Sequence, residues 1–278
     1  MIDPFRQPSQ GRDTALAVEN VTVSIGRVAI VRDVSFHAHA GQVLAIIGPS
    51  GSGKTTLMKA ISGDIAHDGR IFLNGADLRG LGPEPLADMR GVLPQSSQIA
   101  FPLTVAEVIG LGVPGHVATR NARAARISDA LEKVGLGGFE GRSWPDLSGG
   151  EQQRVQLARV LCQVWEPVPE GASPRWLFLD EPVSSLDIKH QYQIMALAAD
   201  YAARGGGVVA VMHDLNLTAA FADTVLVMKQ GRRLAFGAGE EIFRPELLSR
   251  AYDFPLRLVP GAAGDRPVIV PSAGASFS

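Results

Sequence analysis

One nine-residue stretch, "GPSGSGKTT" from Gly48 to Thr56, constrains the fold of this chain more than any other. It matches the phosphate-loop pattern G-x-x-x-x-G-K-[ST], and it lies between the apolar run "QVLAIIG" and the helical run "KTTLMKAISG". The motif requires this context of a buried strand, a glycine-rich turn and a helix. A turn that merely connects a strand to a helix is the alternative, and the context favours the phosphate loop.

The loop predicts a nucleotide site. Successive backbone N–H groups can surround a phosphate, and the dipole of the following helix adds a favourable field. We expect Lys54 to neutralise the β- and γ-phosphates and Thr55 to offer its hydroxyl to Mg²⁺. The predicted nucleotide-binding residues of the loop are Gly48, Pro49, Ser50, Gly51, Ser52, Gly53, Lys54, Thr55 and Thr56.

Two further apolar runs end in residues that suit phosphate chemistry. "WLFLDEP" places Asp180 at a strand end, where it can hold Mg²⁺, and Glu181 next to it, where it can polarise an attacking water. "VVAVMHD" places His213 at the end of another strand. Open α/β sheets bind ligands at the carboxyl ends of their strands, so we expect His213 to contact the γ-phosphate. The alternatives are an exposed acidic strand end and a structural histidine.

Strands that alternate with helices along the chain predict an α/β fold with a mainly parallel sheet. Period-two runs near the N-terminus, such as "ALAVENVTVSI", predict additional strands. From about Ser96 to Val160 the apolar spacing is helical, which predicts a helical insertion between strands. The expected organisation is a flexible tail at 1–14, one domain at 15–260 with its helical subdomain at about 96–160, and a C-terminal tail at 261–278.

Composition excludes several classes of protein. With 46% hydrophobic and 19% charged residues, the 278-residue chain is globular. A formal charge of −2 and a pI near 6.3 argue against a nucleic-acid binder. Cys162 is the only cysteine, so no intrachain disulfide can form, and a reducing compartment is expected. No apolar run reaches the about 18 residues that span a bilayer, and no export signal is visible, so we expect a cytoplasmic protein that reaches a membrane only through a partner.

A second stretch, "LSGGEQQ", also has the features of a phosphate-binding site. Ser148 and Glu151 fit the capping box of a helix, and the residues behind them form an apolar stripe. Capping does not explain Gly149 and Gly150, because glycine in a helical turn costs about 0.5–1 kcal/mol relative to alanine. Both glycines make sense if a phosphate approaches the backbone closely.

These motifs, in this order, resemble the nucleotide-binding subunits of ATP-binding cassette (ABC) transporters, and the resemblance extends from about Ala15 to Pro260. The resemblance implies an ABC ATPase fold, with an antiparallel β subdomain and an inserted helical subdomain beside the phosphate-loop core. By this resemblance, "GPSGSGKTT" is the Walker A motif, "WLFLDE" is the Walker B motif and "LSGGEQQ" is the signature. "LPQSS" is the Q-loop with Gln95, "SSLD" is the D-loop with Asp187, and His213 is the switch histidine.

The resemblance also implies roles and partners. Glu181, His213, Gln95 and Lys54 would take part in hydrolysis, and Thr55, Gln95 and Asp180 would hold Mg²⁺. Ser148, Gly149, Gly150 and Asp187 would close over ATP held by a second copy in a head-to-tail homodimer. Members of the family usually stack an aromatic residue on adenine. The matching position here is Ile25, which offers an apolar contact in place of stacking.

A single cassette without membrane helices is similar to bacterial importer subunits. "LSGGEQQRVQLARVLCQVW" and the insertion "CQVWEPVPEGASPRWLFLD" resemble the iron-siderophore, cobalamin and hemin group, and most of all the hemin importer ATPases. The implied partners are two transmembrane permease subunits and, indirectly, a periplasmic binding protein, with the chain on the cytoplasmic side of the inner membrane and no nucleic acid bound. A siderophore or cobalamin cargo and a soluble, non-transport ABC ATPase stay open as alternatives.

The permease is expected to dock on the segment after Gln95, from Ser96 to Thr104. Phe101 in this segment and Trp144 before the signature are candidates for that contact. Filling of the core is the alternative for both side chains.

Overall fold

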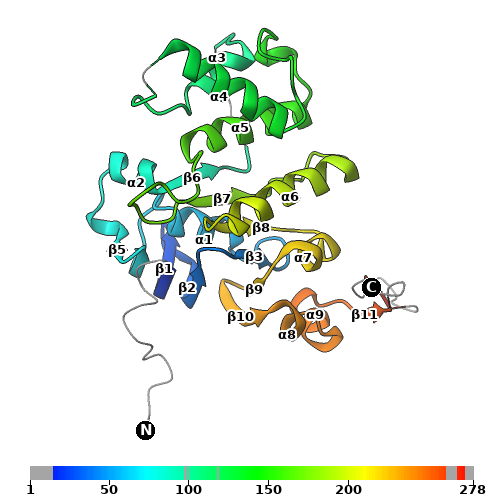
Figure 1. The fold of residues 1–278 in the computed structure, drawn as a ribbon. Coiled ribbons are helices and arrows are strands. Elements are labelled where there is room, and N and C mark those ends of the chain that lie inside the picture. Colours follow the sequence, from blue (N-terminus) through cyan, green and yellow to red (C-terminus); the bar gives the residue numbers. More distant parts are fainter. Residues whose placement is uncertain (1–14, 97–98, 100, 118, 261–267, 273–278) are drawn as a thin grey trace.

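The computed structural model describes residues 15–96, 99, 101–117, 119–260 and 268–272 (Figure 1). The flexible tail predicted for 1–14 lies outside the described residues. The described chain contains two large sheets, a two-stranded sheet in its C-terminal part and an inserted helical region. The helical region lies at one end of the molecule, and the helices of the C-terminal part lie near the other (Figure 1).

The first sheet is antiparallel, with the strand order β2-β1-β4-β5. Its first strand has the boundaries of the period-two run "ALAVENVTVSI", as predicted, and it pairs with the second long strand in a hairpin. The strands are β1 (Ala15–Ile25), β2 (Val28–His39), β4 (Asp68–Leu73) and β5 (Ala76–Asp77). This sheet is the predicted antiparallel β subdomain.

The second sheet has the order β10-β9-β3-β8-β7-β6. Every neighbouring pair in it is parallel except β10 with β9, so the prediction of a mainly parallel sheet is confirmed. The central strands β3, β7 and β8 are buried along their whole length, as expected for a sheet covered on both faces. The strands are β3 (Val43–Ile47), β6 (Arg90–Leu93), β7 (Trp176–Asp180), β8 (Gly207–Val211), β9 (Thr224–Lys229) and β10 (Arg232–Ala238).

Helices cover both faces of this sheet and produce two apolar cores. On one side α1 packs between the two sheets, where side chains such as Trp176 and Phe178 are fully buried. On the other side α6 and α7 pack against the sheet and share a core with the helical region. The helices that border the sheet are α1 (Lys54–Ile61), α2 (Pro83–Met89), α6 (Ile188–Ala203) and α7 (Leu215–Phe221).

The predicted helical insertion consists of α3 (Val105–Gly110), α4 (Arg120–Lys133) and α5 (Gly149–Gln163). Trp144 is only 4% exposed and belongs to the core of this region, so it is a packing residue and not a docking residue. Helix α5 returns to the sheet at β6. A Cβ atom on Gly91 would lie 2.7 Å from Cγ1 of Val160, so α5 and β6 approach each other too closely for any larger residue there.

The C-terminal part contains more structure than the sequence indicates. It comprises α8 (Gly239–Ile242), α9 (Pro245–Tyr252), β11 (Leu256–Val259) and β12 (Val268–Pro271). Strand β12 falls inside the stretch predicted as a tail, 261–278, yet it pairs with β11 and exchanges two hydrogen bonds with the side chain of Asn216 in α7. These contacts tie the end of the described chain to the domain. Within the described ranges, no helix is both long and apolar enough to cross a membrane.

Candidate functional site

The phosphate loop follows β3 and leads into α1, as its sequence predicts. Gly48 (φ 145°) has no room for a side chain, because a Cβ atom there would lie 2.1 Å from the carbonyl oxygen of Met228. Gly53 has a φ of 95°, in the left-handed region that glycine favours. Lys54 folds back over the loop, and its Nζ donates to the carbonyls of Gly48 at 2.8 Å and Pro49 at 3.0 Å.

The end of β7 lies next to the start of α1. The hydroxyl of Thr55 donates to Oδ1 of Asp180 at 3.2 Å, although 125 residues separate the two in the chain. Asp180 is 3% exposed, and this burial raises the pKa of its carboxyl group. Burial lowers the pKa of the Lys54 amine, while the nearby carboxylates of Glu181 and Asp180 act in the opposite direction.

This pair of oxygen atoms fits a magnesium ion. Mg²⁺ prefers oxygen ligands, and a buried carboxylate beside a hydroxyl supplies them. Gln95, the third predicted magnesium contact, is exposed and follows β6. Over the described residues, no hydrogen bond joins Gln95 to either oxygen.

Glu181 and His213 lie side by side, a contact that the sequence did not predict. They follow the neighbouring strands β7 and β8, and Nε2 of His213 lies 2.6 Å from Oε1 of Glu181, where its N–H form donates to the carboxylate. Glu181 has a φ of 54°, which is unusual for a residue with a side chain. The main chain at this position is therefore held by its surroundings.

The signature forms the predicted capping box at the start of α5. The hydroxyl of Ser148 accepts from the backbone N–H of Glu151, and the Glu151 carboxylate accepts from the backbone N–H of Ser148 at 2.8 Å. The Ser148 hydroxyl also donates to the Glu151 carboxylate at 2.7 Å, and this bond, together with the one from the backbone N–H, lowers the pKa of the Glu151 carboxyl group. The stripe behind the cap is buried as predicted: Leu157, Val160, Leu161 and Val164 are all at most 5% exposed.

The two signature glycines differ. A Cβ atom on Gly149 would meet nothing within 4 Å, whereas one on Gly150 would lie 3.0 Å from the carbonyl oxygen of Ser185 and 3.2 Å from Leu186. At Gly150 the close packing against the D-loop of the same chain is a second reason for a small residue, whereas no neighbour in the described chain accounts for Gly149. The phosphate contact of both glycines stays a prediction.

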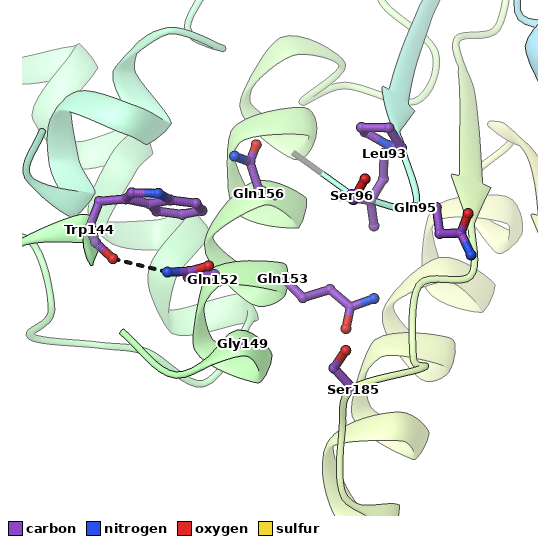
Figure 2. Close-up of a pocket in the computed structure, with 10 residues that line it drawn as sticks. Leu93, Gln95, Ser96, Trp144, Gly149, Gln152, Gln153, Gln156 and Ser185 are labelled. Carbon is purple, nitrogen blue, oxygen red and sulfur yellow. Dashed lines mark hydrogen bonds between the residues drawn. The ribbon is translucent and has the colours of Figure 1, made fainter. Parts of the chain in front are cut away.

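A cavity of about 160 Å³ lies beside the start of α5 (Figure 2). It separates the Q-loop from the signature helix, and Gln95 and Gly149 both line it. The side chain of Gln153 points across it toward the Q-loop side (Figure 2). The remaining lining residues are Leu93, Pro94, Ser96, Trp144, Gln152, Gln156 and Ser185.

Some predicted site residues do not meet within one chain. In the part of the chain that the structure describes, no hydrogen bond or ion pair joins Ser148, Gly149 or Gly150 to the phosphate loop. Asp187 instead caps α6 by accepting from the backbone N–H of His190. Ile25 ends β1 with 63% of its surface exposed.

Two contacts to the site were not visible in the sequence. Gln153 donates from Nε2 to the backbone oxygen of Glu181 at 2.8 Å. Tyr252 in α9 accepts a hydrogen bond of 3.1 Å from the backbone N–H of Gly48. Gln153 belongs to the signature "LSGGEQQ", but nothing in that pattern indicates that Gln153, and not Gln152, contacts the site. The tyrosine carries no motif at all.

Comparisons with known proteins agree with this geometry. Residues 31–184 match the family model described as "ABC transporter". The chain is 52% identical over 257 residues to the hemin import ATP-binding protein HmuV of Jannaschia sp. (strain CCS1), covering 92% of this chain and 94% of that protein. It is 51% identical over 260 residues to the protein of the same name from Mesorhizobium japonicum, covering 93% and 98% of the two chains.

Solved structures show the same fold. The ADP conformation of MJ1267, an ATP-binding cassette of an ABC transporter, superposes with a TM-score of 0.70 at 25% identity, over 85% of this chain and 97% of that one. CbiO1 from Clostridium perfringens, part of the ABC transporter complex CbiONQ, gives a TM-score of 0.70 at 26% identity, over 86% and 94%. The fold is that of an ABC ATPase. From its motifs, its geometry and these relatives, the chain belongs to the ABC transporter family.

Proposed function

We propose that the chain is the ATP-hydrolysing subunit of a bacterial importer that takes up hemin through a permease dimer in the inner membrane. One observation carries the hydrolytic part: the lysine of the phosphate loop, a buried carboxylate and the Glu181–His213 pair lie at the ends of three neighbouring strands, β3, β7 and β8. The hemin cargo is supported by identity of about half the residues, over nearly the whole chain, to proteins named for hemin import.

The geometry suggests how the chain promotes hydrolysis. The loop amides and Lys54 bind and neutralise the phosphates of ATP, the substrate. Glu181 accepts a proton from water while the water oxygen bonds to the γ-phosphorus and the bond to the ADP oxygen breaks. His213 holds the carboxylate of Glu181 through the 2.6 Å contact. Thr55, Asp180 and Gln95 would hold Mg²⁺, which neutralises phosphate charge when bound.

A complete site needs a second copy of the chain. Ser148 and Gly149 are exposed, and Gly149 has open space in front of it, so both can reach a nucleotide held by another subunit. Asp187 is also exposed, and Gly150 serves the packing of its own D-loop. This arrangement supports a head-to-tail homodimer with two composite sites. Ile25 would supply an apolar contact to adenine.

Glu181→Gln tests the dimer. The variant should bind ATP without hydrolysing it and should form an ATP-dependent dimer on gel filtration. An unchanged monomer at saturating ATP would count against composite sites. The ATPase rate of the wild type, measured beside it, shows whether the chain is an enzyme.

Reconstitution tests the cargo. With the permease dimer in vesicles, hemin-loaded binding protein should stimulate ATP hydrolysis more than the same system loaded with ferric siderophore or cobalamin. Greater stimulation by either of the other cargoes would assign the chain to that branch of the importer group. Hydrolysis that no loaded binding protein changes would remove the transport proposal and leave a stand-alone ATPase.

A further inference from the structure

Two neighbouring glutamines at the start of α5 have different partners. Gln153 donates from Nε2 to the backbone oxygen of Glu181 at 2.8 Å. Gln152 donates from Nε2 to the backbone oxygens of Trp144 and Leu147, both at 3.3 Å. Successive residues of a helix point about 100° apart. One glutamine therefore faces the sheet and the other faces the segment before the signature (Figure 2).

The contact from Gln153 reaches an unusual point of the main chain. Glu181 adopts left-handed backbone angles, with a φ of 54°. For a residue with a side chain this conformation persists only when neighbouring groups hold it. Besides the glutamine amide, the described neighbours of the Glu181 carbonyl are Ser184 Oγ at 3.3 Å and Ser184 N at 3.4 Å. Gln153 makes the shortest of these contacts, and it is the one that comes from another element of the fold.

Gln153 lines the cavity, and the Oε1 atom of its amide is buried and has no hydrogen-bond partner among the described residues. A buried acceptor without a partner costs free energy, and the bond from Nε2 to Glu181 offsets part of this cost. The cavity has room for water, and Gln95 from the Q-loop lines it as well.

We propose that Gln153 is a positioning residue for hydrolysis. Its N–H group fixes the main chain of Glu181, so that the carboxylate lies against His213 and faces the attacking water. Helix α5 begins at the signature, which is proposed to contact a nucleotide held by the second subunit. Through Gln153, the same helix would align Glu181, the base that acts on the nucleotide of its own subunit. The proposal rests on the hydrolytic role proposed above for Glu181.

The test compares Gln153→Met with Gln152→Met in the full-length protein. Methionine has nearly the size of glutamine but cannot donate the hydrogen bond. For Gln153→Met we expect kcat for ATP hydrolysis to fall at least tenfold, with KM and the Kd for ATP changed less than threefold. Gln152→Met, which removes two hydrogen bonds from the same turn of the helix, should keep kcat within threefold. Melting curves of both variants report their folding.

The outcomes separate the two proposals. A wild-type protein that hydrolyses no ATP would overturn the proposed function itself. If the wild type is active and both variants lose the same fraction of kcat, the glutamines act only in packing and the positioning role is wrong. A loss for Gln153→Met that appears in ATP affinity, with kcat retained, would also overturn it.

Discussion

The backbone N–H of Gly48 donates a 3.1 Å hydrogen bond to the hydroxyl of Tyr252, 204 residues later in the chain. Burial raises the pKa of this tyrosine to about 12, so the hydroxyl stays neutral at physiological pH. Tyr252 ends α9, outside the segment 31–184 that matches the family model. The first residue of the phosphate loop is thus anchored by the C-terminal part of the chain.

Tyr252→Phe should destabilise the protein by about 1–3 kcal/mol, because it leaves the buried N–H of Gly48 without an acceptor. The ring and its packing are kept, so the loss reports the hydrogen bond. Urea unfolding measures the stability, and a titration with ATP should show weaker binding. Tyr192→Phe is the matched control, because Tyr192 is exposed on α6 and should tolerate the loss of its hydroxyl. Equal stability of the two variants would rule out an anchoring role.

His213→Ala should lower kcat by about 100-fold, at the lower end of the effect of groups that assist proton transfer. The 2.6 Å contact that holds the Glu181 carboxylate is lost, whereas the phosphate loop is untouched. ATP binding should therefore persist, which a fluorescent ATP analogue can measure. His190→Ala, which removes a ring hydrogen-bonded to Asp187 and not to Glu181, serves as the control. Full activity of His213→Ala would contradict the role assigned to the pair.

Asp180→Asn should raise the melting temperature of the nucleotide-free protein at pH 7. Burial raises the pKa of Asp180 in the folded state, so the folded protein binds its proton more tightly than the unfolded chain does. The Asp180 carboxyl group therefore contributes fully to the stability of the fold below its pKa in the unfolded chain, about 3.9. This contribution is lost as the pH rises through its pKa in the folded protein. The advantage of the asparagine should shrink as the pH falls toward 4. Scanning fluorimetry from pH 4.5 to 8 measures it, and a difference that grows on acidification would reverse the assignment.

Cys162 should resist thiol reagents in the folded protein. It is fully buried in α5, and burial raises the pKa of its thiol to about 12, so almost no thiolate forms at pH 8. We expect reaction with Ellman's reagent to be at least about 100-fold slower than for free cysteine, and to become stoichiometric in guanidinium chloride. Rapid labelling without denaturant would show that α5 opens locally in the native state.

Phe101→Asp should uncouple hydrolysis from transport. The Phe101 side chain is 71% exposed in the segment after the Q-loop, where the permease is proposed to dock. The isolated variant should keep its ATPase rate, because this exposed side chain is not one of the proposed catalytic residues. Stimulation by the permease and uptake of cargo should fall at least about tenfold, as expected when an apolar anchor is replaced by a charge. Val168→Asp, at an exposed site between α5 and β7, is the control. Unchanged uptake by Phe101→Asp would place the docking surface elsewhere.

The sequence predicts most of this fold because its signals are local. Runs such as that of β3 are apolar along their whole length, and the phosphate loop fixes its own strand, turn and helix. Helix α2 was not predicted, because its seven residues include two prolines, and α9 lies beyond the last motif. Strand β12 was predicted as tail because its partner is known only once the chain is folded.

For the site, the motifs identify residue types, and the fold supplies their contacts. The approach of Thr55 to Asp180 and that of His213 to Glu181 follow from the strand order β3-β8-β7, which the motifs do not give. The Gln153 contact depends on the angle at which α5 meets β7, and no pattern in the sequence encodes that angle. Of the segment where the permease is expected to dock, residues 97, 98 and 100 lie outside the described ranges.

The close packing of Gly91 against Val160 fixes one point of α5 against β6, about which the helix can tilt. Gly149 lies eleven residues from Val160, about 16 Å along the helix axis at about 1.5 Å per residue. A tilt of about 10° around that point moves the signature end by about 3 Å and Gln153 by about 2 Å, while the contact with β6 hardly changes. A 2.8 Å hydrogen bond does not survive a shift of about 2 Å unless its acceptor follows. A tilt of α5 about this contact would therefore either break the bond from Gln153 or displace the Glu181 main chain with it.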